Sequence, residues 1–396
     1  MVNNLKNINK KTIQDININK KRILLRTDYN VPLDTNGNIS DDIRIRESLP
    51  TLQYLIENEC KIYICSHLGR PNGKIIKKLS LKPVCKRLSE LLNKPINLLN
   101  MHNEITDTDT DTINMLENVR FNKEEEENNP NFARKLSNIA DIFVNDAFGT
   151  AHRAHASTTG VTKFIPSVAG LLFSKEIKIL NSLLDKPEKP FTAIIGGAKV
   201  SDKIGVLDNL INIAQNIIIG GGMAYTFIKA EKLILKNIDI ADNEIKHAKY
   251  LIEKSKELNI TINLPKDVIV TKEFQENAKF RNVASNNIKT NELIMDIGDE
   301  SILKFKDILN NSKTILWNGP MGVFEWKNFS NGTYQLANHL SNLKNVTTVI
   351  GGGSTAEVFG KLNLENYISH ISTGGGATLE FLEGKILPGY ASLLNN

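Results

Sequence analysis

A chain of 396 residues is longer than a single hydrophobic core usually grows, about 250–300 residues, so its length favours two domains. Its composition, 41% hydrophobic and 23% charged, is that of an ordinary globular protein, and no run of about 18 apolar residues predicts a membrane span. The net charge of +5 is too small to indicate a nucleic-acid partner, and the first residues lack the apolar core of a signal peptide. We therefore expect a cytoplasmic protein with small-molecule ligands.

Short apolar, β-branched runs alternate with helical patterns along the chain. In the first half the runs cover residues 22–26, 61–65, 114–117 and 142–145. In the second half they cover residues 191–195, 216–219, 267–270, 314–317, 347–350 and 367–372. This alternation is typical of parallel sheets with helices on both faces. We predict an α/β fold of two Rossmann-like three-layer (αβα) domains with mainly parallel sheets.

A helix followed by prolines separates the two halves. Leu172, Ile177 and Leu184 lie near helical spacing, and Pro187 and Pro190 end that pattern. We predict a hinge helix here, with an amino-terminal domain over residues 1–186 and a second domain from residue 187.

Polar and basic residues follow the runs of the first half. In an open parallel sheet, ligands bind beyond the carboxyl ends of the strands. The candidate residues there or soon after are Arg26, Asp28, Asn30, Arg44, His67, Arg70, Arg120 and Arg153. Arginine holds phosphate or carboxylate through a planar fork, so this set predicts a site for a small, multiply charged anion. A phosphate contact suits His67 better than work as a general base, whereas Asp28 and Asn30 could stabilise a turn or accept a hydrogen bond from a substrate hydroxyl.

Glycine-rich turns follow the runs of the second half, in the segments GGAK, GGGM, WNGP, GGGS and STGGGA. Such turns let backbone N–H groups approach phosphate oxygens, which predicts a nucleotide site, although no P-loop sequence is present. Lys199 and Lys203 flank the start of a predicted helix, four residues apart and hence on one face, and could neutralise a phosphoryl group in transfer.

Several segments occur in one order: RTDYNVP, SHLGRP, ENVRFN, DAFGTAHR, GGAKVSDK, GGGMA, WNGPMGVFE, GGGSTA and STGGGA. This ordered set resembles the phosphoglycerate kinase family over nearly the whole chain. The resemblance implies reversible transfer of a phosphoryl group from 1,3-bisphosphoglycerate to ADP, by a monomer whose two domains close about a hinge. It also implies a nucleotide domain over residues 187–380 and a tail over residues 381–396 that returns to the first domain.

The resemblance assigns roles to individual residues. For 3-phosphoglycerate or 1,3-bisphosphoglycerate it implies binding by Asp28, Asn30, Arg44, His67, Arg70, Arg120 and Arg153. For ATP or ADP it implies binding by Lys203, Gly220, Gly221, Asn318, Glu325, Gly351, Gly352, Gly353, Ser354 and Thr355. The resemblance also implies catalytic roles for Arg44, Lys199, Lys203, Gly352 and Gly375.

One position departs from the family pattern. Where the family usually has an aspartate that binds the nucleotide's Mg²⁺, this chain has Ser354. A serine hydroxyl can still ligate Mg²⁺, so we expect activity with a weaker metal dependence or affinity.

Three alternatives remain open at this stage. A nicotinamide-dependent dehydrogenase would explain the glycine turns, but a dominant GxGxxG unit followed by an acidic residue is lacking. A non-catalytic anion- or RNA-binding protein would explain the arginines, but not the nucleotide-like second half. An inactive relative that binds ligands, disabled at Ser354, is the third alternative.

Overall fold

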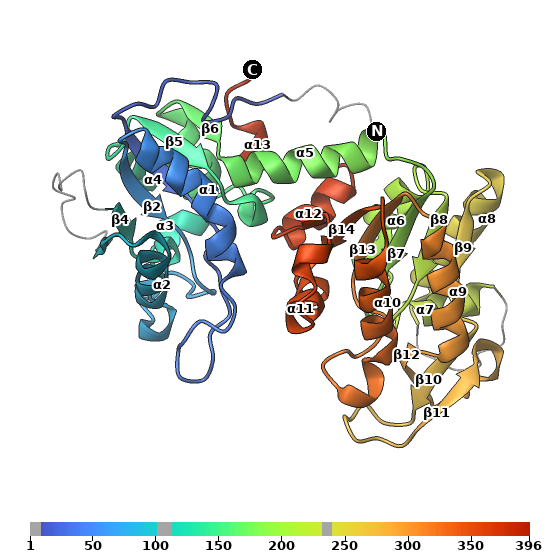
Figure 1. Ribbon diagram of the computed structural model, residues 1–396. Helices are drawn as coiled ribbons and strands as arrows, with labels where there is room; N and C mark the ends of the chain where they lie inside the picture. The colour runs from blue at the N-terminus through green and yellow to red at the C-terminus, as the bar shows by residue number, and fades with distance from the viewer. Residues whose placement is uncertain (1–8, 101–112, 232–239) are drawn as a thin grey trace. The chain divides into compact units, whose positions relative to one another are not determined.

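The computed structural model describes residues 9–100, 113–231 and 240–396, which form two compact units (Figure 1). Unit 1 contains the described residues up to Ile179 together with Lys385–Asn396, and unit 2 contains the described residues of Leu180–Gly384. The chain passes from unit 1 to unit 2 inside helix α5 (Leu171–Asp185). This helix ends before the two prolines, as predicted, while the division between the units lies ahead of residue 186.

Unit 1 contains a six-stranded, fully parallel sheet with the strand order β3-β4-β2-β1-β5-β6. The strands are β1 (Arg22–Arg26), β2 (Lys61–Cys65), β3 (Ile96–Leu99), β4 (Ile113–Leu116), β5 (Ile142–Asn145) and β6 (Ser167–Ala169). The helices are α1 (Ile43–Glu57), α2 (Lys82–Leu92), α3 (Lys123–Glu126), α4 (Pro130–Ser137), the first part of α5 and α13 (Pro388–Ala391). Because all strands are parallel, their carboxyl ends lie along one edge of the sheet.

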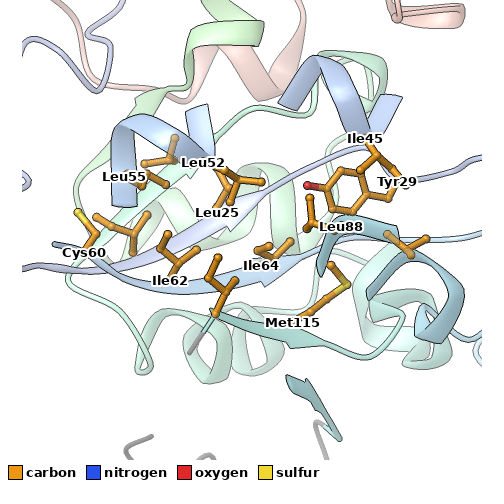
Figure 2. Close-up of a cluster of buried hydrophobic side chains, with 14 of the residues drawn as sticks. Leu25, Tyr29, Ile45, Leu52, Leu55, Cys60, Ile62, Ile64, Leu88 and Met115 are labelled. Carbon is orange, nitrogen blue, oxygen red and sulfur yellow. The ribbon is translucent and has the colours of Figure 1, made fainter. Parts of the chain in front are cut away.

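The core of unit 1 joins strand residues to helices α1 and α2. Figure 2 shows Leu25 and Ile64 of the sheet in one cluster with Leu52 and Leu55 of α1 and Leu88 of α2. These five side chains have no exposed surface. Each such burial contributes about 1.5–3 kcal/mol relative to an exposed side chain, so this cluster stabilises the packing of α1 and α2 on the sheet.

Unit 2 contains a second six-stranded parallel sheet, with the order β15-β14-β13-β7-β8-β9, and a three-stranded sheet, β11-β10-β12. The strands are β7 (Phe191–Ile195), β8 (Asn216–Ile219), β9 (Thr261–Asn263), β10 (Asp267–Thr271), β11 (Phe280–Ala284), β12 (Leu293–Ile297), β13 (Thr314–Asn318), β14 (Thr347–Gly351) and β15 (His370–Ile371). The helices are α6 (Ile204–Leu210), α7 (Ala224–Ala230), α8 (Asp242–Glu257), α9 (Asp299–Asn310), α10 (Asn331–Asn342), α11 (Gly353–Lys361) and α12 (Gly376–Leu382).

The predicted fold class is confirmed, since both large sheets are parallel and flanked by helices. One predicted run differs in its pairing: β10 belongs to the small sheet, where it is antiparallel to β11 and β12. Another is shorter than predicted, because residues Glu365–Tyr367 form a 3₁₀ turn ahead of β15. Among the described residues, no helix combines the length and the apolar character that a membrane span requires.

Candidate active site

The predicted anion site of unit 1 begins where β1 and β2 end. Arg44, in the first turn of α1, donates a hydrogen bond to the Asp28 carboxylate, and His67 Nδ1 lies 3.8 Å from Asp28 Oδ1. Burial would raise the pKa of Asp28, but the positive charge of Arg44 above all outweighs it and lowers this pKa to about 2. Burial lowers the pKa of His67 well below its usual value, so the ring is neutral at pH 7.

A buried network that the sequence reasoning missed lies beside this pair. Arg26, which has no exposed surface, donates from Nε to Ser157 Oγ at 2.8 Å, and its Nη2 lies 3.5 Å from His67 Nδ1. The Ser157 hydroxyl donates in turn to the buried carboxylate of Glu125 at 2.6 Å. Arg26 was noted as a residue at a strand end, but no spacing in the sequence connects it with Glu125 or Ser157.

Two of the remaining arginines of the predicted site, Arg70 and Arg120, lie on or beside the loop after β2. Arg120 Nη1 donates to the Gly69 carbonyl at 2.9 Å, and the Gly69 N–H donates to Asn30 Oδ1 at 2.8 Å. Burial, with the charge of Arg26, lowers the pKa of Arg120 to about 10, and the charge of Arg153 contributes to this shift. Arg70 follows Gly69 and is exposed. The structure thus brings Asp28, Arg44, His67, Asn30 and Arg120 together, with Arg70 at the exposed side of the loop. Arg153 is linked to this group only through the effect of its charge on Arg120.

The predicted nucleotide site of unit 2 centres on Asn318, the last residue of β13. Its Oδ1 accepts a hydrogen bond from Lys203 Nζ. Its Nδ2 is buried, has no hydrogen-bond partner within the described residues, and lies 3.0 Å from the position that a Cβ of Gly351 would take. A buried donor without a partner is costly. This donor faces the Gly351–Gly352 turn, where a ligand oxygen could accept from it.

Two glycine features keep backbone open at these strand ends. Gly352 has a φ of +89° immediately before α11, a conformation that favours glycine. A Cβ on Gly221 would lie 2.7 Å from the Gly197 nitrogen, so the turns after β7 and β8 approach too closely for a side chain. The Gly319 N–H donates to Thr355 Oγ1 at 2.8 Å, which connects the turn after β13 with the first part of α11.

The other predicted nucleotide residues differ in exposure. Gly353, Ser354, Lys199 and Glu325 are exposed, Gly220 is buried directly after β8, and Gly375 has open space around its Cα. Lys199 precedes the 3₁₀ turn Ser201–Lys203, and α6 begins only at Ile204, so the two lysines do not share one face of an α-helix as expected. Burial lowers the pKa of Lys203 to about 8.

The residues of unit 2 fit a metal carried by the nucleotide better than a metal held by the protein alone. In the part of the chain that the structure describes, no three His, Cys, Asp or Glu side chains form a metal-binding group. Ser354 places one exposed hydroxyl in the first turn of α11. Mg²⁺ in phosphate sites commonly keeps several waters and uses one or two protein ligands beside phosphate oxygens, which this donor set permits.

Each parallel sheet therefore ends in a site of different chemistry. Unit 1 presents guanidinium groups and a neutral histidine, whereas unit 2 presents glycine backbone, a lysine and the Asn318 amide nitrogen, which has no hydrogen-bond partner among the described residues. Sites of these two kinds on one chain, without a P-loop, define a phosphotransferase that binds a small anion and a nucleotide separately.

Comparisons with known proteins identify the family. A family profile described as phosphoglycerate kinase matches residues 13–385. A phosphoglycerate kinase from Dictyoglomus turgidum is 48% identical over 393 residues, covering 97% of this chain and 99% of the relative. One from Clostridium kluyveri is 46% identical, covering 98% and 99%.

Solved structures agree with the sequence comparisons. The structure of phosphoglycerate kinase from Coxiella burnetii is 41% identical, with a TM-score of 0.85, and the match covers 97% of this chain and 98% of that one. The enzyme from Pyrococcus horikoshii OT3 is 31% identical, with a TM-score of 0.83 and the same coverage. The chain belongs to the phosphoglycerate kinase family, whose members are phosphotransferases with a carboxyl group as acceptor and act in glycolysis.

Proposed function

We propose that unit 1 binds 3-phosphoglycerate or 1,3-bisphosphoglycerate and that unit 2 binds ATP or ADP with Mg²⁺. The phosphoryl group then passes reversibly between the acyl phosphate and ADP. One observation carries this assignment: the described chain has a cationic site at the strand ends of unit 1 and a glycine-lined site with an unpartnered amide at those of unit 2.

The substrate site uses arginine for charge and polar side chains for the hydroxyl. Arg70, Arg120 and Arg153 would bind phosphate or carboxylate oxygens through N–H donors, with His67 as a neutral partner. Asp28 is ionised, since its pKa is about 2, and can accept from the substrate hydroxyl together with Asn30.

The chemistry requires no general base. The attacking carboxylate of 3-phosphoglycerate is already ionised at pH 7, because carboxyl pKa values lie near 4. Because burial holds the pKa of His67 well below its usual value, the ring stays neutral even at a somewhat acidic pH, and the reaction does not require it to take up or release a proton. The protein therefore contributes position and charge, which suits in-line phosphoryl transfer.

The nucleotide site supplies charge and N–H donors. Lys203 is mostly protonated at pH 7, since its pKa is about 8, and Asn318 holds its ammonium group. Arg44 and Lys203 would stabilise the phosphoryl group in transfer, with Lys199 and the backbone of Gly352 and Gly375 as further donors. The remaining contacts are proposed for Gly220, Gly221, Glu325, Gly351, Gly353, Ser354 and Thr355. Mg²⁺, when bound by phosphate oxygens and Ser354, would neutralise charge on the nucleotide.

Transfer also needs a conformational step. Because the two ligands bind to different units, the units must close to bring donor and acceptor together and to exclude water.

We propose that the chain acts as a monomer, since one chain supplies both sites. We also propose that it acts in the cytoplasm, without a nucleic-acid or membrane partner. We also propose that the functional domains divide at residues 186/187 and 380/381, a few residues from the boundaries of the two compact units at 179/180 and 384/385.

A coupled assay of ATP with 3-phosphoglycerate, with Mg²⁺ titrated, tests the proposal directly. We expect turnover that depends on Mg²⁺ and needs both substrates. Calorimetry with each ligand alone separates the alternatives: both ligands bound without turnover would indicate a binding protein disabled at Ser354, and neither ligand bound would overturn the proposal.

A further inference from the structure

The loop that carries Arg153 contacts both chain segments that connect unit 1 with unit 2. This loop, residues 146–153, follows β5. The chain leaves unit 1 along α5 and returns to it after Gly384, and both segments contact the loop from within unit 1. We call Asp146, Phe148, Gly170, Phe173 and Tyr390 the junction.

Asp146 fixes the start of the loop to two elements. Its N–H donates to the carbonyl of Arg26, the last residue of β1, at 2.8 Å. Its Oδ1 accepts from the Phe173 N–H in the first turn of α5 at 3.1 Å. Only 1% of Asp146 is exposed, so the contact with α5 is shielded from water.

Gly170 is needed for this contact. A Cβ on Gly170 would lie 2.2 Å from Asp146 Oδ1, well inside the distance at which atoms overlap. The Gly170 N–H also donates to the Asn145 carbonyl at 2.9 Å. The carboxylate therefore fits against bare backbone at the point where α5 begins.

Aromatic side chains join the same loop to the returning segment. The edge of Phe148 meets Phe173 at a centroid distance of 5.6 Å, and Phe173 stacks on Tyr390 at 5.9 Å. Figure 1 shows α13, which carries Tyr390, beside the amino-terminal part of α5. The Gly389 N–H donates to the Ala151 carbonyl at 2.8 Å, two residues before Arg153.

A buried carboxylate at this position is costly. Burial raises the pKa of Asp146 to about 6, although N–H groups and the Thr51 hydroxyl partly offset it. A neutral side chain would remove that cost, so stability alone does not favour aspartate here. Its acceptor geometry toward α5 is what a neutral aliphatic residue could not supply.

We infer that Asp146 is a positioning residue, which holds the Arg153 loop against the two segments that connect the units. The inference rests on the proposed function, because it assumes that Arg153 binds the substrate. Displacement of the loop would misplace Arg153 without touching the nucleotide site. Small misplacements of binding groups cost up to about 100-fold in rate.

Three variants of the full chain test the inference. Asp146→Ala removes the acceptor. Gly170→Ala keeps the Asp146 residue but adds a methyl group that pushes its carboxylate away from α5. Asp146→Asn keeps an oxygen that can accept from Phe173. We expect the first two to raise the KM for 3-phosphoglycerate about 10-fold to 100-fold, with an unchanged calorimetric Kd for ADP, and we expect Asp146→Asn to stay within about threefold of the parent.

The double variant Asp146→Ala/Gly170→Ala isolates the contact. Because alanine at 146 vacates the space that the methyl group needs, the double variant should bind substrate about as well as Asp146→Ala alone. Leu88→Ala serves as the matched control, since Leu88 is fully buried in unit 1 and lies outside the junction. It should lower the unfolding midpoint without raising the KM for 3-phosphoglycerate.

The outcomes separate this inference from the proposed function. Arg153→Ala should weaken 3-phosphoglycerate binding if the assignment of Arg153 is right. If Arg153→Ala weakens 3-phosphoglycerate binding but Asp146→Ala and Gly170→Ala do not, the positioning role of Asp146 alone is overturned. The same conclusion follows if Leu88→Ala loses as much substrate affinity as Asp146→Ala, or if the losses of the two single variants add in the double variant. Unchanged substrate affinity in Arg153→Ala would overturn the assignment on which the inference depends.

Discussion

The guanidinium of Arg44 donates a hydrogen bond to the carboxylate of Asp28, although Arg44 lies in the first turn of helix α1 and Asp28 follows strand β1. Since the pKa of Asp28 is about 2, the pair stays charged throughout the neutral range. Asp28, itself proposed to bind the substrate, thus holds Arg44 in the predicted substrate site before any ligand binds. Such preorganisation reduces the entropy that binding must overcome.

Removal of this guanidinium should abolish most of the activity. We expect Arg44→Ala to lower kcat by about 10³-fold or more, because a positioned arginine can stabilise a transferring phosphoryl group by that amount. The stability cost should be on the order of 1 kcal/mol, since Arg44 is partly exposed and the charge of Arg26 still acts on Asp28. Steady-state kinetics and thermal unfolding measure the two effects.

Arg46→Ala is the matched control for this experiment. Arg46 lies on the same helix and pairs with Asp42 at 2.8 Å, with more than half of its side chain exposed. It should keep kcat within about twofold of the parent. A near-normal kcat in Arg44→Ala would remove the role assigned to Arg44.

Acid should destabilise unit 1 through buried histidine. Burial lowers the pKa of His155 to about 3, so below about pH 6.5 the unfolded chain binds a proton that the folded chain does not. The contribution of His155 to the unfolding free energy is therefore fully maintained above that pH and falls by at most about 1.4 kcal/mol per pH unit as pH drops toward 3. His155→Gln should flatten this slope.

Two optical probes can show which unit is destabilised by acid. The two tryptophans of the chain, Trp317 and Trp326, both belong to unit 2, so their fluorescence reports that unit, whereas far-ultraviolet circular dichroism reports both. His247→Gln, a partly exposed position of unit 2, is the control. A pH slope in the dichroism that His155→Gln leaves unchanged would refute the assignment to His155.

The interior strands could be predicted from sequence because burial on both faces leaves a continuous apolar run. The bounds of β1, β2, β5, β7 and β8 match the predicted runs. Strands β3, β9 and β11 lie at sheet edges and have at most one buried residue each, so no run of buried apolar residues marks them. The run in β10 was visible, but apolar residues do not encode whether the partner is parallel.

The candidate site followed from sequence only where its residues adjoin strand ends. His67, Arg120 and Asn318 each lie at or just beyond a strand end, as the parallel-sheet rule requires. Glu125 and Ser157 lie in short helical segments far along the chain from Arg26, and Asp146 contacts α5 through backbone N–H groups of that helix. Contacts of that kind depend on tertiary packing and leave no spacing to detect.

Closure of the units should need both ligands. Because the cationic site and the glycine-lined site belong to different units, either ligand alone completes only one half of the reaction site. We expect small-angle X-ray scattering to show a smaller radius of gyration only when 3-phosphoglycerate and magnesium ADP are both present. Compaction of equal size with one ligand would contradict closure driven from two sides.

Ser354 offers a test of metal affinity that does not depend on turnover. We expect Ser354→Asp to tighten the binding of magnesium ADP by roughly tenfold, about 1.4 kcal/mol, because an exposed carboxylate in the first turn of α11 is a stronger Mg²⁺ ligand than a hydroxyl. The favourable helix dipole there also stabilises the added negative charge. Calorimetric titration of ADP measures the change.

Two comparisons show whether the gain comes from the metal. Ser354→Asn adds an oxygen of similar reach without charge, so it should change the Kd for magnesium ADP by less than about threefold. With EDTA present, Ser354→Asp should bind ADP more weakly than the parent, because the carboxylate then faces phosphate without a cation between them. Tighter binding in both the presence and the absence of Mg²⁺ would mean that residue 354 acts on the nucleotide directly, and an unchanged affinity for magnesium ADP would show that the metal is held by phosphate and water alone.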